Sequence, residues 1–155
     1  MTKFAPGTPA PDFDLPADPG DRLRLSDLRG QNVVLYFYPR DDTSGCTKEA
    51  IGFTEKAEEF AAANTRVVGV SKDTLTKHEK FRAKYKLGVT LVSDAESDLC
   101  ERYGVWVAKS MYGKSFMGIE RSTFLIDAEG KIVQDWRKVK VAGHVQAVLE
   151  AAQAL

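Results

Sequence analysis

Apolar residues follow two different spacings along the first half of the chain, and each change of spacing marks a new element. Residues 32–38 (NVVLYFY) and 66–71 (RVVGVS) are nearly continuous runs of branched and aromatic residues, as is typical of strands covered on both faces. Between these runs, apolar residues recur at helical spacing, which predicts a helix over residues 43–63. The same spacing predicts a second helix over residues 72–86.

The second half of the chain contains shorter elements. The pattern predicts a strand at residues 90–93 and a short helix at 96–103. Two alternating runs, residues 120–126 and 131–136, are joined by DAEG, which indicates an antiparallel hairpin. Residues 143–154 carry apolar side chains on one face and predict an amphipathic closing helix.

Two stretches have weaker patterns. Residues 1–21 are rich in proline and aspartate, so we expect an irregular lead-in with a short extended piece at 13–15. A short strand at residues 22–25 and a helical turn capped by Ser26 should follow. Residues 105–118 (VWVAKSMYGKSFMG) are the least periodic part of the chain, and we expect a loop whose aromatic and methionine side chains pack over an apolar surface.

The order of these elements indicates an α/β protein, because strands that alternate with helices form parallel sheets through right-handed crossovers. We expect a thioredoxin-like fold: a central mixed β-sheet flanked by helices, with an N-terminal extension and a C-terminal β-hairpin plus helix. A length of 155 residues matches a single domain, residues 1–155.

Composition limits the kind of partner and compartment. The chain has 22 basic and 22 acidic side chains without a long block of either sign, which argues against nucleic acid or an anionic membrane as the main partner. The N-terminus lacks the apolar core of a secretory signal, and no run approaches the roughly 18 apolar residues of a membrane span. We therefore expect a cytoplasmic protein. Its two cysteines, Cys46 and Cys100, are too few for a disulfide framework or a zinc cluster.

The candidate chemistry lies in residues 36–49 (YFYPRDDTSGCTKE). Cys46 falls in the first turn of the predicted helix, where unpaired amides and the positive end of the helix dipole favour thiolate over thiol. If Thr43 is the N-cap residue, its hydroxyl lies beside the Cys46 amide and can reach a ligand at the sulfur. Pro39 closes the preceding strand and stiffens the entry to the loop.

A helix terminus alone activates a thiol only modestly. It contributes about 0.3 to 2 kcal/mol, which lowers an ordinary thiol pKa of about 8.5 by at most roughly one and a half units. A strong effect needs a nearby cation, and we favour Arg121, because a guanidinium fixed at the start of a core strand could donate to both sulfur and substrate. Arg40, Arg137 and Lys48 are the alternatives.

The motif resembles a known family. The segment PRDDTSGCTKE fits the PxxxTxxC signature of peroxiredoxins, and FYP, ERSTFLI and WRKVKVAGH add a similarity to the Q-type, or bacterioferritin comigratory protein, branch. The similarity runs from about Phe4 to the C-terminus. It implies a monomeric antioxidant enzyme that reduces hydrogen peroxide and organic hydroperoxides, without metal or bound cofactor. Thioredoxin or a low-molecular-weight thiol would be its reductant.

The resemblance also implies a role for each residue of the motif. Cys46 would be the peroxidatic cysteine, whose thiolate attacks the peroxide and becomes a sulfenic acid. Thr43 would orient the peroxide, Pro39 would shield the sulfur from water, and Arg121 would polarise both reactants. Glu49 matches an acidic residue usual in this branch and would hold the arginine.

The chain departs from the family at the second, resolving cysteine. Many members carry it five residues after the first, where this chain has Ile51, and they have a proline where this chain has Ser44. Other members carry it in the next helix, where this chain has Arg82 in FRAKY. Two alternatives remain. Either Cys100 resolves Cys46 after local unfolding, or Cys100 is a buried structural residue and an external thiol resolves Cys46.

Other interpretations receive less support from the sequence. His78 and His144 are possible bases, but an activated thiolate needs no base, so we expect both to be structural. A thiol–disulfide oxidoreductase would need a second cysteine beside the first, and the chain has no CxxC motif. The third class is a non-enzymatic binding or holdase protein on the same scaffold.

Overall fold

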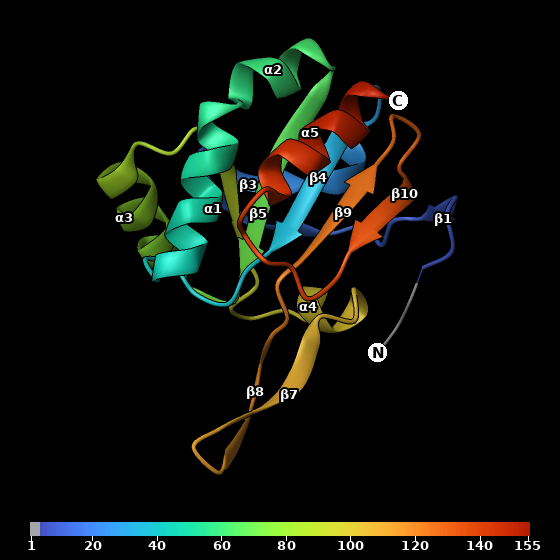
Figure 1. Cartoon of the computed structure of the whole chain (residues 1–155). Helices are drawn as coiled ribbons and strands as arrows, with labels where there is room; N and C mark the ends of the chain where they lie inside the picture. The colour runs from blue at the N-terminus through green and yellow to red at the C-terminus, as the bar shows by residue number, and fades with distance from the viewer. Residues whose placement is uncertain (1–3) are drawn as a thin grey trace.

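A mixed β-sheet forms the centre of the computed structural model, which describes residues 4–155 (Figure 1). Within those residues this sheet has eight strands in the order β1-β10-β9-β4-β5-β6-β2-β3. Their bounds are β1 Thr8–Pro9, β2 Asp14–Asp18, β3 Asp21–Arg24, β4 Asn32–Phe37, β5 Thr65–Ser71, β6 Thr90–Ser93, β9 Ser122–Ile126 and β10 Lys131–Trp136. Strands β4, β5 and β6 run parallel, while the remaining neighbours pair antiparallel.

Helices cover both faces of this sheet. They are the 3-10 helix η1 Leu25–Leu28 and the α-helices α1 Ser44–Glu55, α2 Ala57–Ala62, α3 Leu75–Tyr85, α4 Leu99–Arg102 and α5 His144–Gln153. Buried side chains of α1, α2, α3 and α5 share one apolar cluster. Those of η1 and α4 belong to the cluster on the opposite face, together with the N-terminal strands.

Strand β4 separates the two clusters because its side chains alternate between the faces. Leu35 and Phe37 join the cluster that contains α4, whereas Val34 and Tyr36 join the cluster beneath α1 and α5. All six residues of β4 are buried, which confirms the prediction of a central strand covered on both faces. Residues assigned to different clusters therefore lie on opposite sides of the sheet.

The predicted fold class is confirmed, including the parallel strands, the antiparallel hairpin of β9 and β10, and the closing helix α5. The lead-in is more regular than predicted. Strand β2 pairs with both β3 and β6, so the N-terminal extension completes one edge of the sheet. Residues 1–3 of the predicted lead-in lie outside the described residues.

The single helix predicted over residues 43–63 is wrong, because the chain forms two helices with a break at Lys56. Thr54, in the last turn of α1, donates its hydroxyl to the carbonyl of Ala50 and accepts the amide of Gly88. Side-chain bonds of this kind compete with the helical backbone and bend it. The apolar spacing does not register this break because Phe60 of α2 joins the same cluster as Phe53 of α1.

The predicted loop at residues 105–118 is also wrong. Residues Trp106–Met111 form β7 and residues Lys114–Ile119 form β8, an antiparallel pair separate from the central sheet. Tyr112 and Gly113 form the turn with positive φ angles of 52° and 77°, the conformation of tight hairpins. In Figure 1 this hairpin extends away from the body of the molecule.

The side chains of the hairpin do not all pack as predicted. Trp106 is half-buried against the core, with the Lys72 ammonium 4.9 Å from its ring centroid. Met111, Tyr112 and Phe116 are exposed instead, and Tyr112 exposes 96% of its surface. Among residues 4–155, no helix combines the length and apolar character needed to cross a bilayer.

Candidate active site

Cys46 lies in the first turn of α1, at the end of the loop that follows β4. Thr43 is the N-cap residue, with φ −96° and ψ 158°, and its carbonyl accepts the amide of Thr47 at 2.8 Å. The N-cap position of Thr43 is as predicted, but its hydroxyl makes no capping bond and donates to the carbonyl of Arg40 at 2.9 Å. The Cys46 side chain is only 1% exposed.

Arg121, immediately before β9, brings a cation to the sulfur. Its Nη2 lies 3.3 Å from Cys46 Sγ, and its Nη1 donates to Glu49 Oε1 at 2.6 Å. Cys46 and Glu49 are three residues apart in α1 and therefore share one face of the helix. A planar guanidinium can contact both at once, which a lysine ammonium on its flexible chain cannot do in the same geometry.

Gly45 makes room for this guanidinium. A Cβ atom at position 45 would lie 3.1 Å from Arg121 Nη2, closer than side chains ordinarily approach. The small residue before Cys46 is therefore part of how the sequence admits Arg121 to the first turn of α1.

Burial and charge oppose each other within the Glu49–Arg121 pair. Burial raises the pKa of Glu49 to about 7, although the Arg121 charge acts in the opposite direction. Burial lowers the pKa of Arg121, but Glu49 and Cys46 outweigh it, so the net shift is upward. The guanidinium is therefore a permanent positive charge beside the sulfur.

The alternative cations are placed differently from Arg121. Arg40 and Lys48 are exposed, and Arg40 lines the cavity described below. Arg137 donates to Asp135 and to the carbonyls of Tyr103 and Gly104, and its guanidinium lies 4.9 Å from the Phe124 ring centroid. Tyr103 and Phe124 belong to the cluster on the face opposite Cys46.

Lys109 is a cation near the site that the sequence prediction missed. It extends from β7 over Gly118, and its Nζ donates to the carbonyl of Ile119. Burial and then the charge of Arg121 lower the pKa of Lys109, while Cys46 acts in the opposite direction. The Tyr112–Gly113 turn was the available signal, since recognising it would have paired β7 with β8.

A cavity of about 560 Å³ lies between the Cys46 loop and the β7–β8 hairpin. Pro39, Arg40 and Thr43 form its side toward the loop. Trp106, Lys109 and exposed apolar residues of the hairpin form the opposite side. Pro39 and Thr43 therefore meet at one cavity, whose lining does not include Cys46 or Arg121. A small ligand there would be bordered by both polar and apolar groups.

Cys100 occupies a different environment. It is fully buried in α4, where its amide donates to Asp94 Oδ2 at 2.8 Å. Burial, with the Asp94 charge as the next cause, raises the pKa of the Cys100 thiol well above its ordinary value. Cys100 and Cys46 belong to clusters on opposite faces of the sheet.

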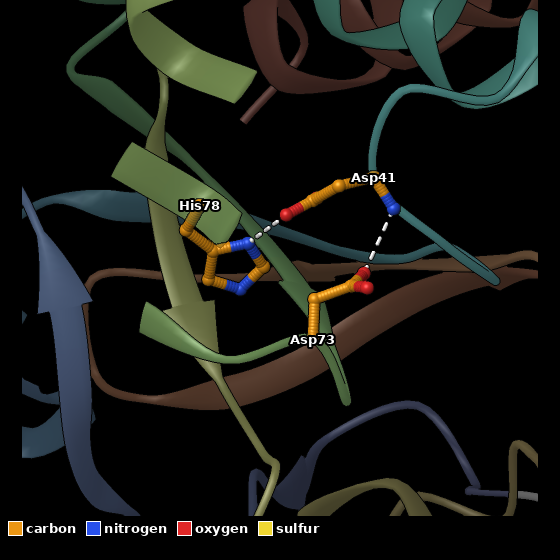
Figure 2. Close-up of side chains that lie close together, drawn as sticks. All are labelled: Asp41, Asp73 and His78. Carbon is orange, nitrogen blue, oxygen red and sulfur yellow. Dashed lines mark hydrogen bonds and ion pairs between the residues drawn. The ribbon is translucent and has the colours of Figure 1, made fainter. Parts of the chain in front are cut away.

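The two histidines are both buried and bonded within the fold. His144 Nε2 lies 2.8 Å from Thr123 Oγ1, and burial, followed by the Arg121 charge, lowers the His144 pKa to about 4. His78 Nδ1 lies 2.6 Å from Asp41 Oδ2 (Figure 2). Asp41, Asp73 and His78 are a group of the described residues whose ligand atoms, all within 4.8 Å, could hold a metal ion. His78 contacts the Asp41 carboxylate, and the Asp41 backbone amide donates to Asp73.

Comparison with known proteins places the chain in a family. The model of the AhpC/TSA family matches residues 6–135. Peroxiredoxin Bcp of Bacillus subtilis is 49% identical over 144 residues, covering 93% of this chain and 92% of that protein. Peroxiredoxin Bcp of Xanthomonas campestris is 46% identical over 156 residues, covering 99% of this chain and 98% of that protein.

Solved structures agree with this assignment. Peroxiredoxin Q of Xanthomonas campestris superposes with a TM-score of 0.87 at 46% identity, covering 92% of this chain and 90% of that one. The Xylella fastidiosa homologue superposes with a TM-score of 0.92 at 37% identity, covering 99% and 98%. Another Xanthomonas structure was described for the alkyl peroxide reduction activity of that protein. The chain belongs to the AhpC/TSA family and is a peroxiredoxin, a thiol-dependent peroxidase.

Proposed function

We propose that Cys46 is the peroxidatic cysteine of this enzyme and that Arg121 activates it. The observation that carries this proposal is the 3.3 Å contact between Arg121 Nη2 and the sulfur, with Glu49 fixing the other end of the guanidinium. A buried thiolate needs such a charge-assisted donor, since burial without a partner disfavours the ionised form.

In the proposed reaction the Cys46 thiolate attacks one peroxide oxygen and forms the S–O bond as the O–O bond breaks. The bonding pair of the O–O bond leaves with the second oxygen, which takes a proton from solvent and departs as water or alcohol. Cys46 becomes a sulfenic acid. The Arg121 guanidinium stabilises both the starting thiolate and the negative charge that develops on the oxygens.

Pro39 and Thr43 position the peroxide in this proposal. The Thr43 hydroxyl donates to the Arg40 carbonyl, so its oxygen can accept the O–H of a hydroperoxide. Pro39 lies on the same cavity and limits access of water from the side of the loop. Glu49 has no direct role in the chemistry and acts by orienting Arg121.

An external thiol, rather than Cys100, completes the cycle in our proposal. Cys100 lies on the opposite face of the sheet, and its raised pKa keeps it protonated, whereas attack on a sulfenic acid requires a thiolate. The external thiol displaces water from the sulfenic acid and forms a mixed disulfide with Cys46. A second thiol then attacks the external sulfur of the mixed disulfide. This releases the Cys46 thiolate and forms a disulfide between the two external sulfurs. Thioredoxin and a low-molecular-weight thiol are both suitable donors.

Peroxide consumption by purified variants tests this proposal. Wild type and Cys100→Ser should turn over hydrogen peroxide with the same reductant at similar rates, while Cys46→Ser should be inactive. Parallel assays with a thioredoxin system and with a small thiol identify the donor class. Activity in Cys46→Ser would overturn the assignment of the nucleophile, and loss of turnover in a folded Cys100→Ser protein would assign the resolving role to Cys100.

The compartment and oligomeric state belong to the same proposal. We propose a cytoplasmic monomer whose partners are the peroxide and the reducing thiol, without nucleic acid or membrane. Balanced charge and the similarity to peroxiredoxins Bcp support this. Sedimentation of the reduced protein at several concentrations would test the monomeric state.

A further inference from the structure

The loop that carries Pro39 and Thr43 is fastened to the neighbouring β5–α3 segment by contacts that the proposed reaction does not use. Asp41, in the middle of the loop, is the point of attachment (Figure 2). Its amide donates to Asp73 Oδ2 at 2.8 Å, and its two carboxylate oxygens contact the Tyr38 hydroxyl at 2.5 Å and His78 Nδ1 at 2.6 Å. Asp41 is buried despite its place in a loop.

The bonding of His78 requires a proton between it and Asp41. His78 Nε2 lies 2.9 Å from the carbonyl of Val92, and a carbonyl only accepts, so Nε2 carries a hydrogen. Nδ1 faces an oxygen of Asp41 at 2.6 Å, a distance at which two bare acceptors would repel each other. A further proton is therefore shared between the ring and the carboxylate, inside a pair whose histidine has no exposed surface.

The remaining neighbours complete this network. Burial and the Asp41 charge raise the pKa of Tyr38 well above its ordinary value, so the phenol stays protonated and donates to Asp41. The Ser71 hydroxyl lies 2.6 Å from Asp73 Oδ2 and fixes the carboxylate that receives the Asp41 amide. Every oxygen of the Asp41 side chain thus has a partner.

We propose that His78 is a positioning residue for the peroxide site, acting through Asp41 on the loop of residues 39–43. This inference rests on the proposed function of Cys46 and Thr43. Asp41 lies two residues from Pro39 on one side and two residues from Thr43 on the other. A loop released from His78 would displace both groups relative to the sulfur, and displacements of about 1 Å can slow a reaction about a hundredfold.

The experiment compares two reactions of Cys46 in the same variants. One is the single-turnover rate with hydrogen peroxide, which needs the assembled site. The other is alkylation of Cys46 by iodoacetamide, which needs the thiolate and access to the sulfur but not the placement of Pro39 and Thr43. His78→Leu should slow the peroxide reaction about tenfold or more and speed alkylation, because a released loop exposes Cys46, a residue that is only 1% exposed in the folded site.

Conservative variants distinguish the effect of the hydrogen bond to Asp41 from the effect of the volume that the His78 side chain fills in the core. Asn at position 78 can place an amide donor near the position of Nδ1, so His78→Asn should keep the peroxide rate within about threefold of wild type. Asp41→Asn should also remain within about threefold, because its amide can donate to a neutral ring and its oxygen can accept from Tyr38. Glu79→Gln changes the exposed neighbour of His78 and is the matched control for α3.

Each outcome decides the proposal. A peroxide rate in His78→Leu within twofold of wild type would overturn it. An equal fall of the peroxide rate in His78→Asn and His78→Leu would overturn it as well. If His78→Leu does not fold, Asp41→Ala tests the same attachment from the loop and should show the same divergence of the two rates. Inactivity of wild type toward peroxide would instead refute the proposed function, while the alkylation rates would still test the attachment of the loop.

Discussion

Arg121 is the residue on which the proposed chemistry of the site depends most, because it contacts the sulfur and Glu49 at the same time. The contact joins residues that are far apart in the sequence, one in α1 and one before β9. The sequence predicted the partner but not the geometry, since Arg40, Arg137 and Lys48 were equally charged. Arg121 was favoured because a residue at the start of a core strand is held more rigidly than one on an exposed face.

Two substitutions of Arg121 distinguish the contribution of its positive charge to the peroxide rate from the contribution of its planar guanidinium. Arg121→Gln should lower the single-turnover rate with hydrogen peroxide by about 10² to 10³, the usual cost of removing one donor aimed at developing charge. Arg121→Lys should recover only part of this loss, because an ammonium does not bridge the sulfur and Glu49 as a guanidinium does. Stopped-flow measurement checks both. A lysine variant as fast as wild type would show that charge alone suffices.

Glu49 and His144 should give opposite dependences of stability on pH. The folded-state pKa of Glu49 is about 7 against an ordinary 4.5, so its contribution to stability is present below pH 4.5 and is lost as the pH rises through 7. The folded-state pKa of His144 is about 4 against 6.5, so its contribution is present above pH 6.5 and is lost as the pH falls through 4. Each effect is on the order of 3 kcal/mol.

Urea unfolding from pH 4 to pH 8 tests this opposition. In wild type the two effects should largely cancel between pH 4.5 and 6.5. Glu49→Gln should therefore become more stable relative to wild type as the pH rises, and His144→Gln should become less stable relative to wild type. Differences from wild type that do not vary with pH would show that neither group titrates as described.

The helices and strands that could be predicted from the sequence are those whose apolar residues follow the side that packs against the core. Strand β4 and helix α5 were found because each buries a continuous face or run against the core. The β7–β8 hairpin was missed because it projects from the body and lacks a buried face along most of its length. Its Tyr112–Gly113 turn was the remaining signal, and that signal concerns backbone conformation rather than apolar pattern.

Strand β5 requires glycine at position 69, and the apolar spacing of the strand does not explain why. Gly69 pairs with Tyr36 of β4, and a Cβ atom there would lie 2.7 Å from the Tyr36 hydroxyl. Gly69→Ala should lower the free energy of unfolding by about 1 to 3 kcal/mol, the usual cost of overpacking. Gly88→Ala is the control, because its Cβ would meet Thr54 at an ordinary 3.4 Å. Equal stabilities of the two variants in urea would contradict this reading of the β4–β5 contact.

On the scale of the whole molecule, the central sheet separates the two cysteines, which supports the proposed cycle with an external thiol. The sequence left Cys100 open as a resolving residue, because the face on which a helix packs depends on strand order and crossovers. Cys46 and Cys100 belong to the two clusters that β4 divides. A disulfide needs Cα atoms within about 7 Å, so joining these cysteines would require the sheet or its covering helices to open.

Mass spectrometry of the reduced protein after one equivalent of hydrogen peroxide tests the central claim most directly. Trapping with a reagent selective for sulfenic acid should attach the reagent to Cys46 in wild type and in Cys100→Ser, with the sulfenic oxygen lost as water, and should leave Cys100 of wild type as a free thiol. Cys46→Ser should remain unmodified by the same reagent. A disulfide between Cys46 and Cys100 would contradict the external-thiol cycle, and an unmodified Cys46 in protein that has consumed the peroxide would contradict the assignment of the nucleophile.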